Sequence, residues 1–251
     1  MPDTNAQVKI PDGYQLERVS LEYQIDGKSH PVFRGLNLNL PLAGLTVILG
    51  RSGCGKTTLL RLLAALLPPT SGKIRFFKAG TIAAPKAGMV FQESRLFPWM
   101  RAADNITIHM KKDPERANVQ KKYLEMMGLA EFASAYPAQL SGGMAQRIAI
   151  ARALAYEPDI LLMDEPFSAL DYFARLQMQD EILRIYRTLG IGIIFVTHNV
   201  DEALHLATEL LVFKNMASPV SFDLSALSVS KNREVETALL KQDILTLLKG
   251  V

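Results

Sequence analysis

Residues 50–57 constrain this chain more than any other segment, because they match the complete pattern Gly-x-x-x-x-Gly-Lys-Ser/Thr. Glycines allow backbone angles that bring successive N–H groups together around phosphate oxygens. Lys56 then reaches the β- and γ-phosphates of a nucleotide, and the Thr57 hydroxyl ligates Mg²⁺. An apolar run over 45–49 precedes the loop, and leucines recur at helical spacing over 59–67 after it. This strand, loop and helix order favours an ATP or GTP site over an ordinary glycine-rich turn.

The composition indicates a globular chain that depends on partners for any role at a membrane. The 251 residues are 49% hydrophobic, and 28 basic and 25 acidic residues spread along the chain give a net charge of +3. The basic residues are not concentrated in one region, so the charge pattern does not indicate a nucleic-acid partner. The single cysteine excludes an internal disulfide framework and fits a reducing compartment. We expect no secretory signal over 1–15 and no membrane span, since no apolar stretch approaches about 20 residues.

The patterns along the chain predict an α/β fold: a P-loop NTPase core with an antiparallel β portion and an inserted helical lobe. Short β-type runs around the loop strand suggest the antiparallel portion, and they lie at 15–23, 36–40 and 73–77. Residues 96–156 change to Lys-rich and Met-rich helical patterns, which we interpret as the helical lobe.

The second half of the chain returns to strands. Apolar runs at 160–163 and 191–196 flank a helical segment over 172–188, which is a βαβ pattern and predicts parallel strands. We expect a single domain over 1–251, whose C-terminal tail at 215–251 carries a packing helix.

Two acidic residues follow the apolar run at 160–163. The strand carries Asp164 to the carboxyl edge of the sheet, where ligands of α/β proteins bind. Asp164 is expected to hold Mg²⁺, and Glu165 to polarise the attacking water. Taken alone, acidic residues at a strand end usually mark entry into a solvent loop, but the phosphate loop upstream reverses that preference.

Four further segments carry residues that match a known family. They are Gln92 within 89–93; Leu140, Ser141, Gly142 and Gly143 before a helical stretch; Ser168, Ala169, Leu170 and Asp171; and His198 after a strand. Alone, Ser141 reads as a helix N-cap and His198 as a surface histidine. Together, and in this order over about residues 15–210, these segments resemble the ATP-binding-cassette (ABC) ATPase family.

The resemblance implies an ATP site shared by two ATPase subunits that pair head to tail, as a homodimer. On that arrangement Ser141, Gly142 and Gly143 contact the nucleotide of the partner subunit, and Asp171 helps to join the two subunits. The implied catalytic residues are Glu165, His198 and Gln92, and the implied Mg²⁺ contacts are Thr57, Gln92 and Asp164. The implied nucleotide contacts are Tyr23, Gly50, Arg51, Ser52, Gly53, Cys54, Gly55, Lys56, Thr57 and Thr58.

Two of these nucleotide contacts carry their own expectations. Tyr23 matches the adenine-stacking aromatic of the family, although a core role stays open. Cys54 lies among loop N–H groups beside Lys56, so we expect a stabilised thiolate whose alkylation blocks ATP binding.

A hydrophobic cluster at 96–100 includes Phe97 and the only tryptophan, Trp99. Composition leaves core and contact surface equally open. The similarity to ABC transporters implies contact with transmembrane permease subunits, and hence a cytoplasmic protein bound peripherally to the inner face of the membrane. An extracytoplasmic substrate-binding protein would act indirectly.

The local sequences around Phe97 and Ser141 are similar to those of importers for nitrate, sulfonate and taurine. The expected function is therefore ATP hydrolysis that drives import. The alternative is a soluble ABC ATPase that acts on nucleic acid or ribosomes, but that class usually needs long coiled-coil insertions or tandem cassettes, and this sequence has neither.

Overall fold

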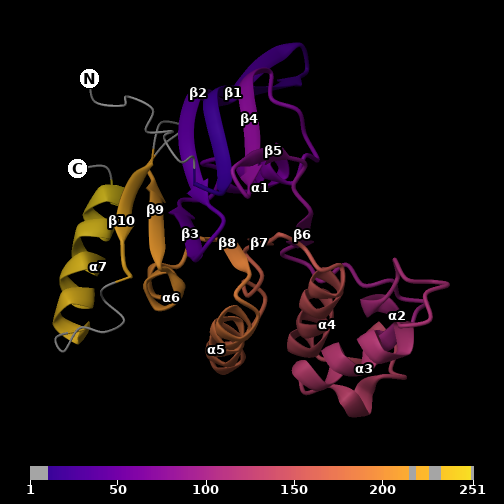
Figure 1. The fold of residues 1–251 in the computed structure, drawn as a ribbon. Coiled ribbons are helices and arrows are strands. Elements are labelled where there is room, and N and C mark those ends of the chain that lie inside the picture. The colour runs from indigo at the N-terminus through magenta and orange to yellow at the C-terminus, as the bar shows by residue number, and fades with distance from the viewer. Residues whose placement is uncertain (1–10, 215–218, 226–232, 250–251) are drawn as a thin grey trace, which may run out of the picture.

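The computed structural model describes residues 11–214, 219–225 and 233–249, which form two β-sheets flanked by helices (Figure 1). The larger sheet has the order β10-β9-β3-β8-β7-β6. Its strands are β3 (Leu45–Gly50), β6 (Ala87–Val90), β7 (Ile160–Asp164), β8 (Gly192–Thr197), β9 (Glu209–Phe213) and β10 (Val220–Asp223). All neighbours are parallel except β10, which runs antiparallel to β9. The predicted βαβ unit is confirmed, because β7 and β8 are adjacent and parallel.

The second sheet is the antiparallel portion that the sequence predicts. Its order is β2-β1-β4-β5, with β1 (Gly13–Ile25), β2 (Lys28–Pro41), β4 (Ser71–Lys78) and β5 (Thr81–Ala83). Asp26 and Gly27 join β1 to β2 with φ angles of 50° and 73°. Positive φ at both central residues is what a two-residue type I′ hairpin turn requires, and it explains the Asp-Gly pair at this turn.

Helix α1 (Lys56–Leu63) lies between the two sheets (Figure 1). Alternate residues of the central strands face opposite ways, so Ile48 packs with Leu59 and Leu60 on the antiparallel-sheet side. Val47 and Leu49 join the core on the other side, beneath the remaining helices. Burial on both faces explains why these strands are continuous apolar runs.

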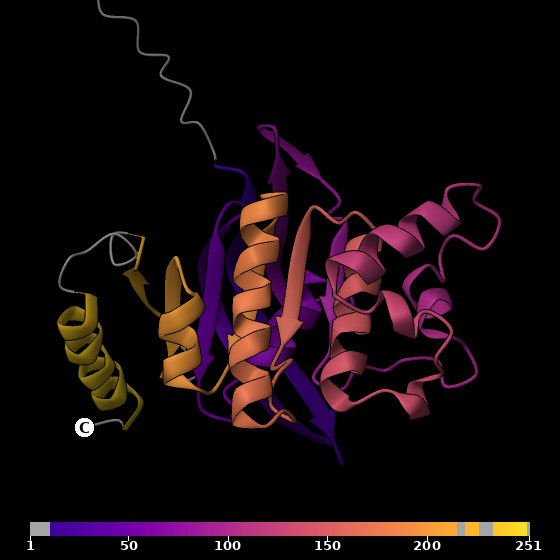
Figure 2. The same ribbon diagram turned by 90° about the horizontal axis from the view of Figure 1, so that it is seen from below.

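The other helices cover the outer face and one end of the larger sheet (Figure 2). The interval 96–156 contains helices and no strand; they are α2 (Ala102–Ile106), α3 (Arg116–Met126), the 3₁₀ turns η1 (Ala130–Phe132) and η2 (Pro137–Gln139), and α4 (Gly142–Ala155). Helices α5 (Tyr172–Leu189) and α6 (Val200–Leu206) follow β7 and β8. Helix α5 ends at Gly190, whose φ of 61° suits a left-handed helix terminus.

The C-terminal tail differs in part from its prediction. Helix α7 (Arg233–Lys249) packs through the fully buried Ile244, but Val235 and Leu239 are 64% and 61% exposed. The strand β10 was not predicted, and residues 215–218, 226–232 and 250–251 of the tail lie outside the described residues. None of the helices in the described ranges is long and apolar enough to cross a bilayer.

Candidate nucleotide-binding and hydrolysis site

The phosphate loop connects β3 to α1 at the carboxyl edge of the larger sheet. Gly53 and Gly55 have φ angles of 82° and 94°, in the left-handed region that side chains disfavour. A Cβ added to Gly55 would lie 2.8 Å from Val32 Cγ1 and 2.9 Å from Phe33 Cζ. Gly55 is therefore required both for its backbone angle and for its close approach to β2.

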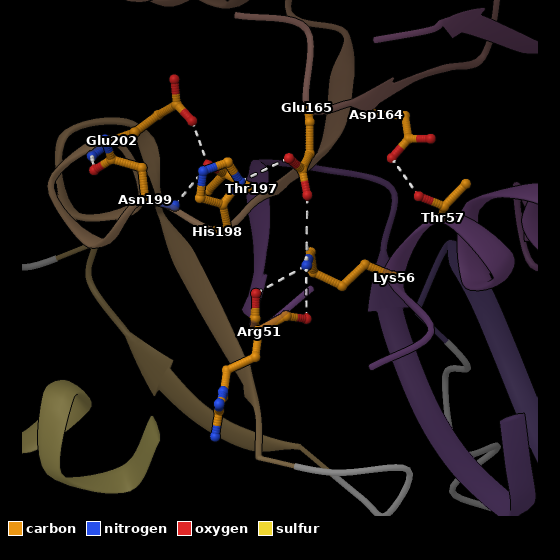
Figure 3. A network of polar contacts seen from close by, with 10 residues as sticks. Arg51, Lys56, Thr57, Asp164, Glu165, Thr197, His198, Asn199 and Glu202 are labelled. Carbon is orange, nitrogen blue, oxygen red and sulfur yellow. Dashed lines mark hydrogen bonds and ion pairs between the residues drawn. The ribbon is translucent and has the colours of Figure 1, made fainter. Parts of the chain in front are cut away.

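The Lys56 side chain is buried inside this loop, with the residue only 5% exposed. Its Nζ donates to the carbonyl oxygens of Gly50 at 2.8 Å and Arg51 at 3.1 Å (Figure 3). Nζ also lies 3.5 Å from Glu165 Oε1. The ammonium is thus held ready by neutral acceptors that phosphate oxygens can replace, with one carboxylate beside it.

Glu165 and His198 meet across the ends of the neighbouring strands β7 and β8. His198 Nδ1 lies 2.7 Å from Glu165 Oε2, so the two oxygens of this carboxylate face a histidine and a lysine. The Glu165 backbone has a φ of 43°, and its N–H donates to the Val196 carbonyl at 3.0 Å. A positive φ outside glycine costs on the order of 1–3 kcal/mol and is concentrated at functional sites.

Thr57 and Asp164 form a second pair beside this cluster. Thr57 Oγ1 donates to Asp164 Oδ1 at 2.9 Å. Burial raises the pKa of Asp164, and the Thr57 hydroxyl opposes that rise by stabilising the carboxylate. A hydroxyl and a carboxylate are the hard oxygen ligands that Mg²⁺ prefers.

The donor set fits Mg²⁺ held jointly with a nucleotide. Within the described residues, no group of three or more His, Cys, Asp or Glu side chains is placed to hold a metal ion. Magnesium commonly uses one or two carboxylates together with substrate phosphates and waters, which matches a site built from one threonine and one aspartate.

The residues predicted to contact the nucleotide or Mg²⁺ lie at different places relative to the phosphate loop. Tyr23 is half-buried on β1, and its hydroxyl lies 3.4 Å from Thr58 Oγ1 at the start of α1. Gln92 is exposed just beyond β6, the strand beside β7, so it follows the same sheet edge as Asp164. Arg51 and Ser52 are exposed on the loop.

The expectation of a stabilised Cys54 thiolate is wrong. Burial raises the pKa of this thiol and outweighs the lowering effects of Lys56 and of backbone N–H groups. A Cβ added to Gly50 would lie 2.6 Å from Cys54 Sγ, which shows that the sulfur packs over β3. The sequence could not reveal this, because neighbours along a loop do not say which way a side chain turns.

The residues expected to contact a second subunit lie at two helix starts. Ser141 caps α4, its Oγ accepting from Met144 N at 3.3 Å, and Asp171 caps α5, its Oδ1 accepting from Ala174 N at 2.9 Å. Helix α4 begins at Gly142, two residues before its expected start. Cβ atoms added to Gly142 and Gly143 would lie 4.0 Å from Leu170 Cδ2, so the two helix starts are neighbours.

Phe97 and Trp99 stand out on the loop before α2. Their ring centroids are 5.6 Å apart at 61°, and Trp99 is 72% exposed, as a contact surface requires. The loop backbone is held by Asn105, which is fully buried and exchanges hydrogen bonds with the Phe97 N–H at 2.8 Å and carbonyl at 3.2 Å. Sequence reasoning missed Asn105, because a polar residue beside Asp104 in a short helical segment is typical of a solvent-facing position.

Helix α4 also forms hydrogen bonds with the segment that carries Gln92. Gln146 Nε2 donates to the Phe91 carbonyl at 3.3 Å, and Arg152 donates to the carbonyls of Ser94 at 2.8 Å and Arg95 at 2.9 Å. The helix that starts at Ser141 is therefore bonded directly to the loop between β6 and the helical lobe. These contacts were not predicted, because they join segments that are more than 50 residues apart.

A phosphate loop at the edge of a parallel sheet, faced by Asp164 and Glu165 on the next-but-one strand, defines the P-loop class of nucleoside triphosphatases. The chain belongs to the ABC transporter family, whose model matches residues 33–168.

Curated relatives and solved structures agree with this assignment. The chain is 42% identical to the taurine import ATP-binding protein TauB of Pseudomonas aeruginosa over 78% of this chain and 76% of the relative. It is 40% identical to the aliphatic sulfonates import ATP-binding protein SsuB of Bacillus subtilis over 75% of each chain. The dimeric, post-hydrolysis structure of the ATP-binding cassette MJ0796 bound to ADP and Pi superposes with a TM-score of 0.73 at 28% identity, covering 84% of this chain and 98% of that one.

Proposed function

We propose that this chain is the ATP-hydrolysing subunit of a membrane importer for taurine or aliphatic sulfonates. The observation that carries the hydrolysis is the set of contacts from Lys56 through Glu165 to His198, at 3.5 and 2.7 Å, beside the Thr57–Asp164 pair. The transport role is supported by relatives at 42% and 40% identity whose names describe import of taurine and aliphatic sulfonates.

Each side chain of the cluster has a separate task in the proposed reaction. Lys56 exchanges its loop carbonyls for β- and γ-phosphate oxygens and balances their charge. Glu165 accepts a hydrogen bond from the attacking water and polarises it, while His198 holds that carboxylate and contacts the γ-phosphate. Thr57, Asp164 and Gln92 hold Mg²⁺, which supplies neutralisation of phosphate charge when it is bound.

The proposed site is completed by a second copy of the chain. Ser141, Gly142 and Gly143 would cover the nucleotide on the partner's phosphate loop, and Asp171 would join the subunits. Ser141, Gly142 and Asp171 are exposed at the two helix starts, and the positive end of α4 favours a phosphate. The same helix is hydrogen-bonded to the Gln92 loop, so closure of the dimer would also move the helical lobe to which α4 belongs.

We further propose that the helical lobe at 96–156 attaches the domain to permease subunits at the cytoplasmic face of the membrane. The exposed Trp99 with Phe97 supports this contact, because an aromatic pair on an anchored loop suits a protein interface. An extracytoplasmic substrate-binding protein would deliver the transported molecule, which never meets this subunit.

The substitution Glu165→Gln tests the hydrolysis. It keeps the shape of the side chain but removes the base, so turnover should fall by at least about 10²-fold while ATP still binds. Size-exclusion chromatography with light scattering should show a dimer with ATP and Mg²⁺ and a monomer without them. Glu131→Gln, on the exposed surface of the lobe, is the control and should hydrolyse normally. Unchanged turnover in the Glu165→Gln protein would refute the assignment of the base.

Uptake by proteoliposomes tests the transport separately. The chain would be reconstituted with the permease and binding protein encoded beside it, and labelled taurine and an alkyl sulfonate supplied outside. We expect uptake that requires ATP and is abolished by Glu165→Gln. ATP hydrolysis without uptake of either compound would leave the enzyme assignment standing and refute the substrate class.

A further inference from the structure

Glu202 is a buried carboxylate that the proposed reaction does not use. It lies on α6, four residues after His198, and is 5% exposed. It accepts a hydrogen bond from Thr197 Oγ1 (Figure 3). It also accepts one from Gln179 Nε2 of α5, at 3.3 Å. Burial raises the pKa of Glu202, and both hydrogen bonds oppose that rise. Burying a carboxylate costs free energy, so a specific role for Glu202 is expected.

The bonds of Glu202 lead to the residues on either side of His198. Thr197 Oγ1 donates its proton to Glu202, which leaves its lone pairs free to accept from Asn199 N at 3.0 Å. Asn199 Oδ1 in turn accepts from the backbone of Asp201 at 2.9 Å and of Glu202 at 3.2 Å. The residues before and after His198 are thus both tied to the start of α6.

Packing alone does not hold the His198 ring in place. Its side chain is 53% exposed, and on the inner side a cavity of about 40 Å³ separates it from α5 and α6. Glu165, Thr197, His198 and Glu202 all line this cavity. Since about 10–15 Å³ accommodates a water molecule, the space is solvent-sized rather than filled by side chains. The position of the ring therefore depends on its hydrogen bond to Glu165 and on the hydrogen bonds that fix the backbone on either side of His198.

We propose that Glu202 is a positioning residue which, through Thr197, holds His198 Nδ1 on Glu165. This rests on the proposed function, in which the Glu165 carboxylate must face the attacking water. Loss of the Glu202 carboxylate frees the Thr197 hydroxyl, relaxes the turn over 197–199 and lets the ring drift from Glu165. A displacement of about 1 Å near reacting groups can cost about 10²-fold in rate.

The main test compares Glu202→Ala with Glu202→Gln. The alanine variant should lower kcat for ATP hydrolysis about ten- to hundredfold with an unchanged affinity for ATP. The glutamine variant should recover most of that loss, because its carbonyl oxygen accepts from Thr197 while the Gln179 amide turns to accept from its NH₂. Asp201→Ala is the matched control: it is the adjacent carboxylate on α6, exposed and paired with Lys241, and should behave as the parent protein.

A spectroscopic measurement tests the positioning without turnover. The chain has four histidines, so ring ¹⁵N spectra are simple and His198→Ala assigns the signal of His198. In Glu202→Ala this signal should shift in the same direction as in Glu165→Gln, and in Asp201→Ala it should not move. If Glu202→Ala does not fold, Thr197→Val removes the connecting hydroxyl and should give the same ring shift and loss of kcat.

The outcomes separate this inference from the proposed function. A parent protein without ATPase activity contradicts the proposed function, and the ring spectra still decide the role of Glu202. Normal kcat or an unmoved His198 signal in a folded Glu202→Ala protein overturns the inference. Glu202→Gln as impaired as Glu202→Ala overturns it too, because the hydrogen bond would then not be the cause.

Discussion

At the scale of single residues, Cys54 shows how two electrostatic effects compete inside a phosphate loop. Lys56 and the loop N–H groups favour the thiolate, whereas burial disfavours any charge on the sulfur. Burial dominates because Sγ packs closely over Gly50 at the end of β3. The thiol is therefore protonated over a wider pH range than an ordinary cysteine.

This predicts slow alkylation. Because the pKa is raised, the thiolate fraction at about pH 7 is below that of a free cysteine, so iodoacetamide should react more slowly with Cys54 than with a model thiol. The rate should climb as the pH approaches the raised pKa. Mass spectrometry follows the reaction without ambiguity, since Cys54 is the only cysteine and Cys54→Ala gives the blank. A rate equal to that of the model thiol would contradict the raised pKa, and a faster rate would restore the stabilised thiolate.

The residues of the site differ in how far the sequence predicts them. Lys56, Thr57, Asp164 and Glu165 were expected at one site because each belongs to a pattern tied to strand ends. The structure pairs Thr57 with Asp164 and Lys56 with Glu165. Glu202 was not expected at the site, because a Glu beside an Asp on a short helix is typical of a solvent-exposed face. Its buried carboxylate also accepts from Gln179 of α5, a contact between separate helices that no local pattern encodes.

At the scale of elements, the starts of α4 and α5 would serve two purposes in the proposed dimer. Ser141 and Asp171 satisfy helix N–H groups within the chain, and both remain exposed for a second subunit. Stability and association therefore meet in the same side chains. Substitutions can separate the two roles, because an N-cap needs only an oxygen acceptor whereas a phosphate contact also depends on charge.

Two substitutions of Ser141 can distinguish its role as a helix cap from its proposed contact with the nucleotide. Ser141→Ala removes the cap and should lower the free energy of unfolding by about 1 kcal/mol, measured by urea titration. Ser141→Asp keeps an acceptor, so its stability should stay close to that of the parent protein. Its negative charge would repel the partner's γ-phosphate, so in the Glu165→Gln background it should abolish the ATP-dependent dimer. A dimer that survives Ser141→Asp would exclude this loop from the nucleotide.

Element prediction failed where hydrophobic periodicity was weak. Strands β3, β7 and β8 and helix α5 were predicted from apolar runs and helical periodicity. The parallel strands β6 and β9 were not predicted. Strand β10 has three exposed residues among its four and pairs only with β9, so it carries no apolar signal. In α7 the apolar residues were expected to pack, but a single helix face meets the domain and leaves Val235 and Leu239 outside.

At the scale of the whole molecule, the two sheets and α1 form a rigid support for the phosphate loop, and the helical lobe extends from the far end of the larger sheet (Figures 1 and 2). Gln146 and Arg152 of α4 connect the two parts by holding the carbonyls of residues 91, 94 and 95. Trp99 lies beyond this connection on a loop fixed by the buried Asn105. The Trp99 loop and the Gln92 segment are therefore both hydrogen-bonded to helices of the lobe.

This arrangement predicts a specific effect of Trp99→Ala. The isolated subunit should keep its fold, because the side chain is 72% exposed, but its affinity for the permease should fall. An interface tryptophan typically contributes about 2 kcal/mol or more, which corresponds to roughly 30-fold in affinity. Binding to permease in detergent micelles or nanodiscs measures the loss, and Ile82→Ala, which truncates a 66% exposed residue on β5, is the control.

The parent protein supplies an independent signal for the same contact. Trp99 is the only tryptophan, so its fluorescence reports this one position. Its emission should shift to shorter wavelength when permease is added, because burial in an interface removes the indole from water. Unchanged emission in a complex that has formed, together with normal affinity of Trp99→Ala, would place the permease on another face of the subunit and leave the aromatic pair without a partner.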